Sequence, residues 1–279
     1  MSVILGYLGP KGTFSEEAAL KYAQQVEDKL ELVEYPTIDQ VVEALLNQEI
    51  NQGIVPLENS LEGGVSITLD LLATSQGIII QRELICPVVH YLVALPGVNL
   101  AGIKELYSHP QVFSQCREYL HRHLCHAEII HWHSTAAAAE VASNSKDKAA
   151  IASKRAAHLF NLEILGADIQ DGNGNVNQTR FVVLGREEQS ATGEDKTSLV
   201  ISIKDAPGSL YSILGAFAKR NINLTRIESR PARKNLGDYL FFIDLEGHRN
   251  ENHISEALNE LESHIVFKKM LGSYPKAAN

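Results

Sequence analysis

The strongest constraint on the fold of this chain is the alternation of two kinds of apolar pattern over its first 185 residues. Val3–Leu8 is a short apolar run typical of a strand, Phe14–Val26 has helical spacing, and this exchange continues as far as Lys154–Phe160. Such alternation predicts an α/β fold with mainly parallel sheets. It breaks at residues 77–95, where two apolar runs follow each other directly. We expect the chain to cross there between two lobes that have a cleft between them.

A polar segment separates this region from a second pattern. Residues 186–196 are mostly polar and show no apolar periodicity. Residues 197–279 then read strand, helix, strand, strand, helix, strand, which is the ferredoxin-like order βαββαβ. We therefore predict a two-lobed domain over residues 1–186, a linker over 187–196 and a smaller domain over 197–279.

The negative charge of the chain, −9 in total, lies on residues 1–196. Neither part therefore predicts a nucleic-acid surface, and an anionic substrate would need local donors such as helix N-termini or a buried Arg. No apolar run approaches the about 20 residues of a membrane span, and the first residues enter a strand without a basic leader. We expect a cytoplasmic protein without a membrane partner, in which the three cysteines are reduced thiols.

Three polar clusters lie at strand ends. Thr179-Arg180-Phe181 follow a turn rich in Asn and Gly and open an apolar strand. A hydroxyl, a fixed cation and an aromatic ring at that point suit a small ring-shaped carboxylic acid. Glu58-Asn59-Ser60 end another strand, just before a Gly-rich turn that starts a helix, where backbone N–H groups point outward. Ser108-His109-Pro110-Gln111 follow a third strand, and Gln115 lies four residues beyond Gln111 on the same helix face.

Each cluster also has a purely structural interpretation. Thr179 could satisfy a turn, Asn59 or Ser60 could cap a helix, and the two Gln side chains could lie on a solvated face. Arg180 is equally compatible with a substrate-binding fork and with a structural ion pair, whereas Phe181 is better explained by packing.

The metal-like and phosphate-like patterns fail on spacing. Asp171 opens a sequence like a calcium loop, but Val176 and Val182 stand where Gly and Glu are required. Gly9–Thr13 lacks the spacing of a phosphate-binding loop. The remaining candidates match no zinc spacing: His121, His123, Cys125, His126, His131 and His133. We predict neither a metal nor another cofactor.

The motifs resemble two known families. Residues 1–185 resemble the catalytic domain of prephenate dehydratases, and residues 197–275 are similar to the ACT regulatory domain. The first resemblance rests on Gly6-Tyr7-Leu8-Gly9-Pro10-Lys11-Gly12-Thr13-Phe14-Ser15, Val55-Pro56-Leu57-Glu58-Asn59-Ser60 with Gly63-Gly64, Ser108-His109-Pro110-Gln111 with Gln115-Cys116, and Thr179-Arg180-Phe181. The second rests on Gly208-Ser209-Leu210-Tyr211 and Glu228-Ser229-Arg230-Pro231, although Ser209 and Tyr211 stand where Ala and Val are frequent.

The resemblance implies a lyase of phenylalanine biosynthesis that converts prephenate to phenylpyruvate, carbon dioxide and water. Its catalytic domain would have two lobes like those of periplasmic binding proteins. Thr179 would donate a hydrogen bond to the departing hydroxyl, and Glu58 or water is an alternative proton donor. The other substrate-binding residues would be Thr13, Ser15, Asn59, Ser60, Ser108, Gln115, Arg180 and Phe181.

The resemblance also implies allosteric regulation by phenylalanine, bound between two ACT domains of a homodimer or of a tetramer built from dimers. The effector-binding residues would be Gly208, Leu210, Tyr211, Asn223, Leu224, Thr225, Glu228, Ser229 and Arg230. Tyrosine is an alternative effector because Tyr211 reshapes the motif. Deletion of residues 190–279 would leave dehydratase activity without regulation.

Two other functions remain open at this point. An arogenate dehydratase would act on a substrate that differs only by an amino group in the side chain. A small-molecule sensor or binding protein without catalytic activity would share the two-lobed layout.

Overall fold

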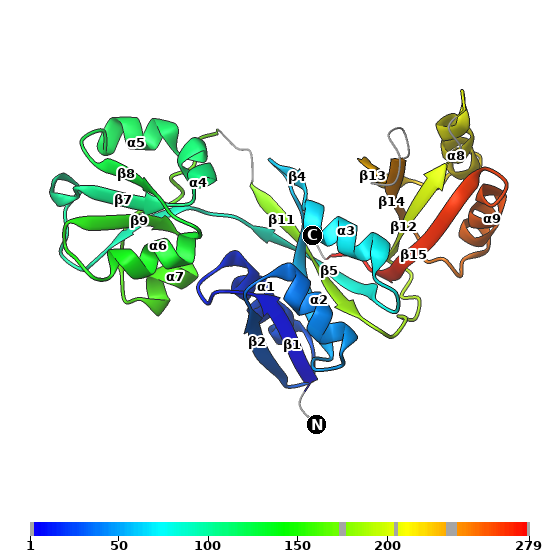
Figure 1. Cartoon of the computed structure of the whole chain (residues 1–279), viewed down its shortest axis with the longest axis horizontal. Coiled ribbons are helices and arrows are strands. Elements are labelled where there is room, and N and C mark those ends of the chain that lie inside the picture. The colour runs from blue at the N-terminus through cyan, green and yellow to red at the C-terminus, as the bar shows by residue number, and fades with distance from the viewer. Residues whose placement is uncertain (1–2, 173–176, 204–205, 233–238, 278–279) are drawn as a thin grey trace.

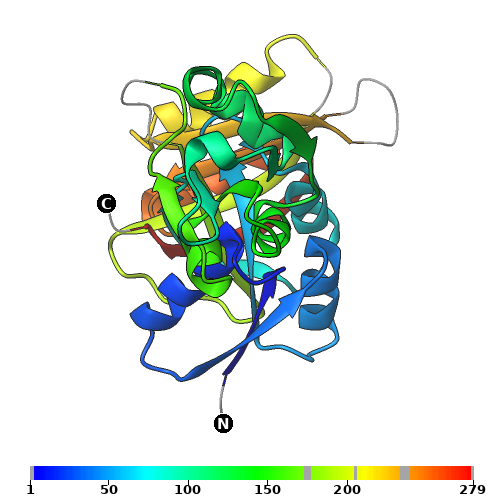
Figure 2. The ribbon, with the colours of Figure 1, turned by 90° about the vertical axis from the view of Figure 1, so that its left-hand side faces the viewer.

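The computed structural model describes residues 3–172, 177–203, 206–232 and 239–277. The chain forms three bodies in a row: a second lobe (residues 91–166), a first lobe (residues 3–87 and 178–188) and a C-terminal domain (residues 195–275) (Figure 1). Figure 2 looks along this row from the second lobe, which lies in front of the first.

The first lobe is an α/β unit with a mixed sheet. The sheet has the order β2 (Leu30–Tyr35), β1 (Val3–Leu8), β3 (Gln52–Asn59), β11 (Gln178–Gly185) and β5 (Ile79–Pro87), and β4 (Gly63–Gly64) pairs with β3. β1 is parallel to β2 and β3, whereas β11 is antiparallel to β3 and β5. The helices are α1 (Phe14–Gln25), α2 (Ile38–Leu46) and α3 (Ser66–Thr74).

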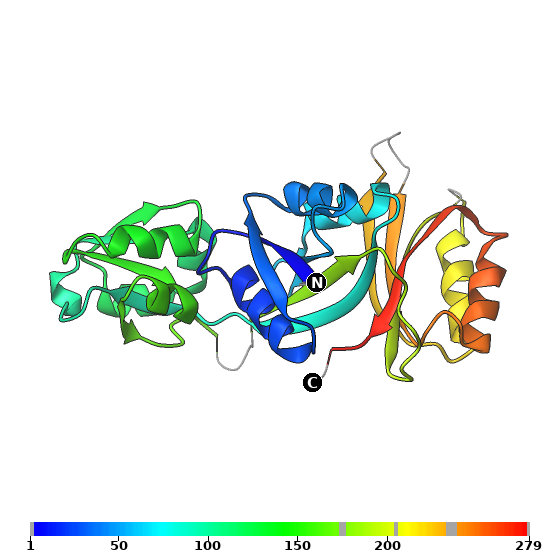
Figure 3. The same cartoon turned by 90° about the horizontal axis from the view of Figure 1, so that it is seen from below.

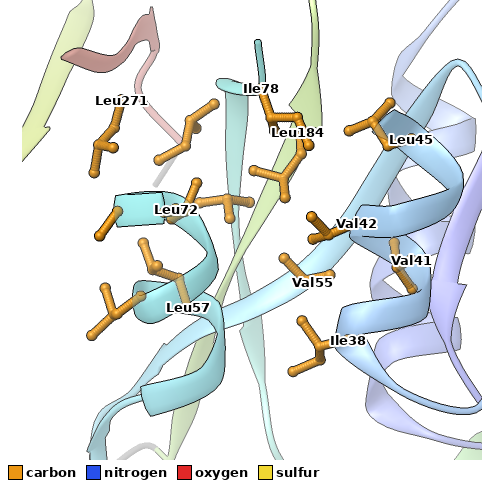
Figure 4. Packing of buried hydrophobic residues seen from close by; sticks show 14 of the residues in the cluster. Ile38, Val41, Val42, Leu45, Val55, Leu57, Leu72, Ile78, Leu184 and Leu271 are labelled. Atoms are coloured by element: carbon orange, nitrogen blue, oxygen red, sulfur yellow. The ribbon is translucent and has the colours of Figure 1, made fainter. Parts of the chain in front are cut away.

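Helix α2 shows why this sequence forms a helix and which face it buries. The Thr37 side chain accepts a hydrogen bond from the backbone N–H of Gln40 and so caps the N-terminus. Ile38, Val41, Val42 and Leu45 are all buried, and their spacing places them on one helical stripe. This stripe packs against β3 in the core cluster of Figure 4.

The second lobe repeats the mixed α/β plan. Its sheet has the order β10 (Glu163–Gly166), β6 (Tyr91–Ala94), β9 (Lys148–Ala152), β7 (Glu105–Ser108) and β8 (Glu128–His131). β7 is parallel to β8 and β9, and β6 is antiparallel to its neighbours. The helical segments are η1 (Leu100–Gly102), α4 (Pro110–Gln115), α5 (Arg117–His123), α6 (Thr135–Ala142) and α7 (Lys154–Leu159).

The sequence pattern over Val112–His123 predicts one continuous helix, but the structure has a break at Cys116. The break comes from a segment that is distant in sequence. The backbone N–H of Asp171 donates to the carbonyl of Gln115 at 2.6 Å, and the Asp171 carboxylate accepts from the N–H of Glu118. These bonds end α4 and cap α5, so one expected helix becomes two.

The crossover expected at residues 77–95 is confirmed. The chain leaves the first lobe at the end of β5, enters the second at β6, and returns from β10 to β11. The strands that make these crossings run antiparallel to their neighbours, and for this reason both sheets are mixed. The expected two-lobed α/β class is also confirmed.

The C-terminal domain has the expected ferredoxin-like order. Its antiparallel sheet runs β13 (Leu224–Pro231), β14 (Tyr239–Glu246), β12 (Asp195–Ile203) and β15 (Ile265–Pro275). Helices α8 (Ser209–Ala218) and α9 (Asn252–Leu261) cover the face that is turned away from the first lobe (Figure 3).

The other face of that sheet shares a hydrophobic core with the first lobe. Phe242, Leu271 and Tyr274 belong to the same buried cluster as Leu72 and Leu184, and Figure 4 shows Leu271 near Leu72. Deletion of residues 190–279 would therefore strip apolar cover from the catalytic domain. Point variants are the sharper way to separate activity from regulation.

Gly272 sets the close approach of β15 to β5, and we predict that Gly272→Ala destabilises the protein. Its φ is +142°, and a Cβ atom there would lie 2.3 Å from the carbonyl oxygen of Ile80. We expect the free energy of unfolding to fall by about 1–3 kcal/mol, measured by thermal or urea unfolding. Gly102→Ala is the control, because its Cβ would meet nothing closer than Asn99 Oδ1 at 3.4 Å. Equal stability of both variants would contradict this packing.

Candidate active site

A chain of hydrogen-bonded side chains joins the two lobes where the crossing strands meet. Asn59 Nδ2 donates to Thr179 Oγ1 at 3.0 Å and to Asn177 Oδ1 at 2.9 Å. Asn177 Nδ2 donates to Gln115 Oε1 at 3.4 Å, and His90 Nε2 lies 2.8 Å from the same oxygen. We call these five side chains the interlobe site. They come from β3, β11, α4 and both connections between the lobes.

The register of β3 and β11 brings two distant motifs together. Thr179 pairs with Asn59 and Arg180 pairs with Glu58, although the motifs are 120 residues apart in sequence. Successive residues of a strand point to opposite faces of the sheet. Asn59 and Thr179 therefore point to the interlobe site, and Glu58 and Arg180 point to the opposite face.

The Thr179 hydroxyl is placed to act as a donor. Its side chain is nearly buried, and its oxygen accepts the hydrogen bond from Asn59. Within the described part of the chain, no acceptor takes the Thr179 hydroxyl hydrogen. The hydrogen is therefore available to a bound molecule.

Gln115 makes a further contact across the lobes. Its Nε2 donates to Glu62 Oε1 at 3.3 Å, and Glu62 lies on the hairpin between β3 and β4. A carboxylate thus already accepts a hydrogen bond from Gln115 in this structure. The same amide could serve a substrate carboxylate in its place.

Several other expected binding residues have structural partners. Thr13 caps α1 by accepting from Glu16 N–H, and its hydroxyl donates to the carbonyl of Pro10 at 2.9 Å. Ser108 is fully buried and donates to the carbonyl of Ile151 at 2.8 Å. Ser15 is buried near the start of α1, and Ser60 accepts from the backbone N–H of Gln178 at 3.0 Å. Phe181 is 2% exposed and packs in a core cluster with Leu5 and Leu84. Substrate binding by these residues stays a prediction.

A second contact between the lobes lies beside the loop Gly9–Thr13. Arg155 donates through Nε and Nη2 to the two oxygens of Glu16, both at 3.0 Å, and Ser153 donates to the carbonyl of Gly12 at 2.8 Å. Burial raises the pKa of Glu16, but the hydrogen bonds from Arg155 and Gly12 outweigh it and lower that pKa overall. The bidentate pair therefore stays charged and holds α1 against α7.

Arg180 lies in a buried ion-pair cluster that spans two domains. Its Nε donates to Glu83 at 2.7 Å, its Nη1 to Asp244 at 2.5 Å and its Nη2 to the Tyr274 hydroxyl at 2.8 Å. Glu83 also accepts from Lys196 at 2.8 Å. Burial disfavours the charges, but the opposite charges lower the pKa of Asp244 and raise that of Arg180. Of the two roles that the sequence left open for Arg180, this geometry favours the structural ion pair.

Residues of the expected effector motif also face the first lobe. Arg226 Nε lies 3.4 Å from Glu58 Oε2, and Arg226 Nη2 donates to Glu228 at 2.5 Å. The Glu228 carboxylate lies against Gly64, and Arg230 pairs with Asp70 at 3.0 Å. Glu58, at the end of β3, is thus tied to β13 of the C-terminal domain.

The remaining effector candidates lie at the start of α8 and on or next to β13. Gly208 has a φ of +84° just before α8, and Tyr211 is 81% exposed. Asn223 bonds Glu246 and Thr225 bonds the carbonyl of Asp244. Leu210, Leu224 and Ser229 complete the set, and effector binding by all of them stays a prediction.

The sequence alone did not single out several residues that the structure brings together: His90, Asn177, Glu62, Arg226, Asp244, Glu83, Glu16 and Arg155. The one local signal was His90, a polar residue within the apolar run from Pro87 to Ala94. The others find their partners only through tertiary contacts.

Three features of the described residues bear on other functions. Over the ranges that the structure describes, no group of three or more His, Cys, Asp or Glu side chains is arranged to hold a metal ion. Among the same residues, no helix is long and apolar enough to cross a membrane. Cys86 and Cys116 are buried free thiols, and Cys125 is an exposed one.

Residues 5–189 match the family model of prephenate dehydratase, and residues 197–263 match the ACT domain. A prephenate dehydratase of Methanocaldococcus jannaschii is 41% identical over 96% of this chain and 97% of its own length. A prephenate dehydratase of Arthrobacter aurescens, solved in complex with L-Phe, superposes with a TM-score of 0.88 at 37% identity, covering 99% of this chain and 90% of that one.

A further solved structure carries a different description. It is a quorum quenching acylase named GqqA, with a TM-score of 0.86 at 29% identity over 98% of both chains. The fold is therefore shared by proteins with different described activities, and function must be argued from the site.

We predict that Arg180→Lys lowers the free energy of unfolding by about 2–4 kcal/mol, because the one ammonium nitrogen of Lys cannot replace the three guanidinium nitrogens that donate to Glu83, Asp244 and Tyr274. Denaturant unfolding measures the change. The control is Arg122→Lys, since Arg122 pairs with Glu118 on the surface and its side chain is 68% exposed. We expect that control to change stability by less than about 1 kcal/mol. A stable Arg180→Lys variant with impaired substrate binding would instead assign Arg180 to the substrate.

Proposed function

Because the chain belongs to the prephenate dehydratase family and carries an ACT domain, we propose that it converts prephenate to phenylpyruvate, carbon dioxide and water. The observation that carries the proposal is the hydrogen bond from Asn59 to the Thr179 oxygen. Since no described residue accepts the Thr179 hydroxyl hydrogen, this hydrogen is free to bond a ligand at the junction of the lobes.

The reaction needs a donor at the departing oxygen. The bond between the ring and its carboxylate breaks, and its electron pair enters the ring as carbon dioxide leaves. The bond from the ring to the hydroxyl breaks at the same time, and its electron pair goes to the oxygen, which becomes water on taking a proton from solvent water. Aromatisation supplies the driving force, so the protein has to hold the carboxylates and stabilise the charge that develops on the oxygen.

Thr179 suits this role as a hydrogen-bond donor. A threonine hydroxyl is a weak acid, so it stabilises the leaving oxygen without transferring its proton beforehand. Asn59 occupies a lone pair of Thr179 Oγ1 and thereby orients the hydroxyl. Gln115, which already donates to a carboxylate, is the candidate to hold a substrate carboxylate. Glu58 is engaged by Arg226 and lies 3.8 Å from Arg180, so we assign it to coupling between the domains and not to proton donation.

The alternatives make different products. An arogenate dehydratase would form phenylalanine, and a sensor would form nothing. An acylase with a covalent mechanism would need a nucleophile activated by a neighbouring base. The partner of the Thr179 hydroxyl is the amide of Asn59, which is not a base, so this site favours donation over nucleophilic attack.

We also propose that phenylalanine regulates the enzyme through the ACT domain, in a homodimer or a tetramer of dimers. Two observations support this proposal. Tyr211 and Ile227 expose 81% and 46% of their surfaces, on α8 and on β13 at the edge of its sheet. The Arthrobacter relative was solved with L-Phe. A cytoplasmic location fits this biosynthetic role.

The contacts of β13 connect the effector motif to the interlobe site. Glu228 and Arg230 belong to the effector motif and contact Gly64 and Asp70 of the first lobe. Arg226 lies between Glu228 and Glu58, the residue next to Asn59. A ligand that shifts β13 therefore acts on the end of β3, which carries Asn59. Such coupling is typically worth about 1–3 kcal/mol.

The catalytic proposal predicts that Thr179→Val lowers kcat for phenylpyruvate formation by about 10²-fold, because it removes one donor to developing charge. Thr179→Ser keeps the hydroxyl and should retain most of the activity. Product analysis with prephenate and arogenate, supplied separately, identifies the substrate. Turnover of the Val variant at the wild-type rate would exclude Thr179 as the donor.

The regulatory proposal predicts that Arg226→Met raises the phenylalanine concentration for half-maximal response by about tenfold or more, since it removes the link from Glu228 to Glu58. Titration of the activity with phenylalanine and with tyrosine measures the shift. Arg220→Met is the matched control, because Arg220 pairs with Glu260 within the C-terminal domain. If both variants respond like the wild type, the signal takes another route.

A further inference from the structure

We propose that His90 is a positioning residue that sets the orientation of the Gln115 side-chain amide for substrate binding. The inference rests on the proposed function and deepens it. It concerns a residue that no motif in the sequence marks and that acts on the substrate only through Gln115.

The backbone of His90 is fixed by the returning connection. His90 lies between β5 and β6, where the chain first crosses between the lobes. Its backbone N–H donates to Gln170 Oε1 at 3.0 Å, and its carbonyl accepts from the N–H of Ile169 at 3.1 Å. His90 is 2% exposed, and its imidazole forms a T-shaped contact with the Phe14 ring at a centroid distance of 5.9 Å. The ring therefore has one defined position.

The contacts of Gln115 define which nitrogen of His90 carries the hydrogen. Gln115 Oε1 is an acceptor only, so His90 Nε2 at 2.8 Å is the donor. Asn177 Nδ2 donates to the same oxygen at 3.4 Å. With both donors on Oε1, the NH2 group is turned toward Glu62. If the Gln115 amide were flipped, its NH2 group would face the N–H donors of His90 and Asn177, and no acceptor would lie between them, which is unfavourable.

The burial of His90 argues against a role in packing alone. Its Nδ1 is buried and has no hydrogen-bond partner among the described residues. An unpaired buried nitrogen is a cost that a Leu or Phe side chain would avoid while filling the same space. Burial also lowers the pKa of the ring, and the Gln115 hydrogen bond opposes this only in part. The ring is therefore a neutral donor at neutral pH.

The consequence is a preset donor for an anionic ligand. The NH2 group of Gln115 bonds the Glu62 carboxylate in this structure, and a substrate carboxylate offers the same acceptor chemistry. His90 contributes by keeping Gln115 Oε1 away from that carboxylate, since two oxygens facing each other would repel.

The test compares two variants of His90. Gln places an amide nitrogen near the position of imidazole Nε2, so His90→Gln should keep KM for prephenate within about threefold of wild type. His90→Leu removes the donor and should raise KM by about tenfold, the equivalent of one hydrogen bond, with a smaller change in kcat. Combined with Gln115→Ala, His90→Leu should raise KM no further than Gln115→Ala does alone.

His248→Leu is the control for the loss of a buried imidazole. His248 is 1% exposed, and its Nε2 lies 3.2 Å from the carbonyl of Gln189, remote from the interlobe site. This variant should lose thermal stability and leave KM for prephenate unchanged.

Three kinetic results would overturn the proposal. The first is an equal rise of KM in His90→Gln and His90→Leu. The second is a KM of the double variant that exceeds the KM of Gln115→Ala alone. The third is loss of the acidic limb of the pH profile of kcat/KM in His90→Gln, which would make the imidazole an acid or base. An independent measurement needs no turnover: 15N NMR of the ring should show the tautomer with hydrogen on Nε2, and hydrogen on Nδ1 would contradict the assignment. Wild-type protein without prephenate turnover would refute the proposed function, while the NMR result would still decide whether His90 donates to Gln115.

Discussion

The pairing of β11 with β3 is the interaction on which the rest of this molecule depends. β11 is the strand on which the chain returns from the second lobe, and its register sets Thr179 beside Asn59 and Arg180 beside Glu58. Because neighbouring residues of a strand point to opposite faces, one tripeptide serves two purposes. Thr179 faces the interlobe site, whereas Arg180 enters the ion-pair cluster under the C-terminal domain. A slip of one residue would exchange a neutral donor for a buried cation.

The Arg180 cluster shows how charge is used at the domain seam. A buried ion pair adds little net stability when it is compared with apolar residues of the same shape, but it is costly to break. Arg180 is shared by Glu83 of the first lobe and Asp244 of the C-terminal domain, so the cation is satisfied only when both domains are in register. The apolar residues between the two domains contribute buried surface, and the charged residues specify how the C-terminal domain is oriented on the first lobe.

The sequence predicted what depends on local periodicity and on contiguous motifs. The crossover at 77–95 was visible because two strand-like runs followed each other without a helix between them, and the ferredoxin-like order was visible from its alternation. The sequence did not predict the break at Cys116, because Asp171 causes it from 55 positions away. His90 was missed for a similar reason. A single polar residue in an apolar run has no pattern, and its partner Gln115 lies 25 positions further along the chain, on α4. The sequence marks Arg180 as important. It does not show that the Arg180 side chain bonds residues of the C-terminal domain, because that domain lies outside the motif.

The shared core between the first lobe and the C-terminal domain has a consequence for how such proteins change over evolutionary time. Leu271 and Phe242 of one domain pack in the same cluster as Leu72 and Leu184 of the other, so a change of volume on one side requires a compensating change on the other. The two domains are thus expected to accumulate substitutions in pairs across the seam. A chimera that joins this catalytic domain to the regulatory domain of a distant relative would inherit mismatched surfaces unless both halves of that cluster were transplanted together.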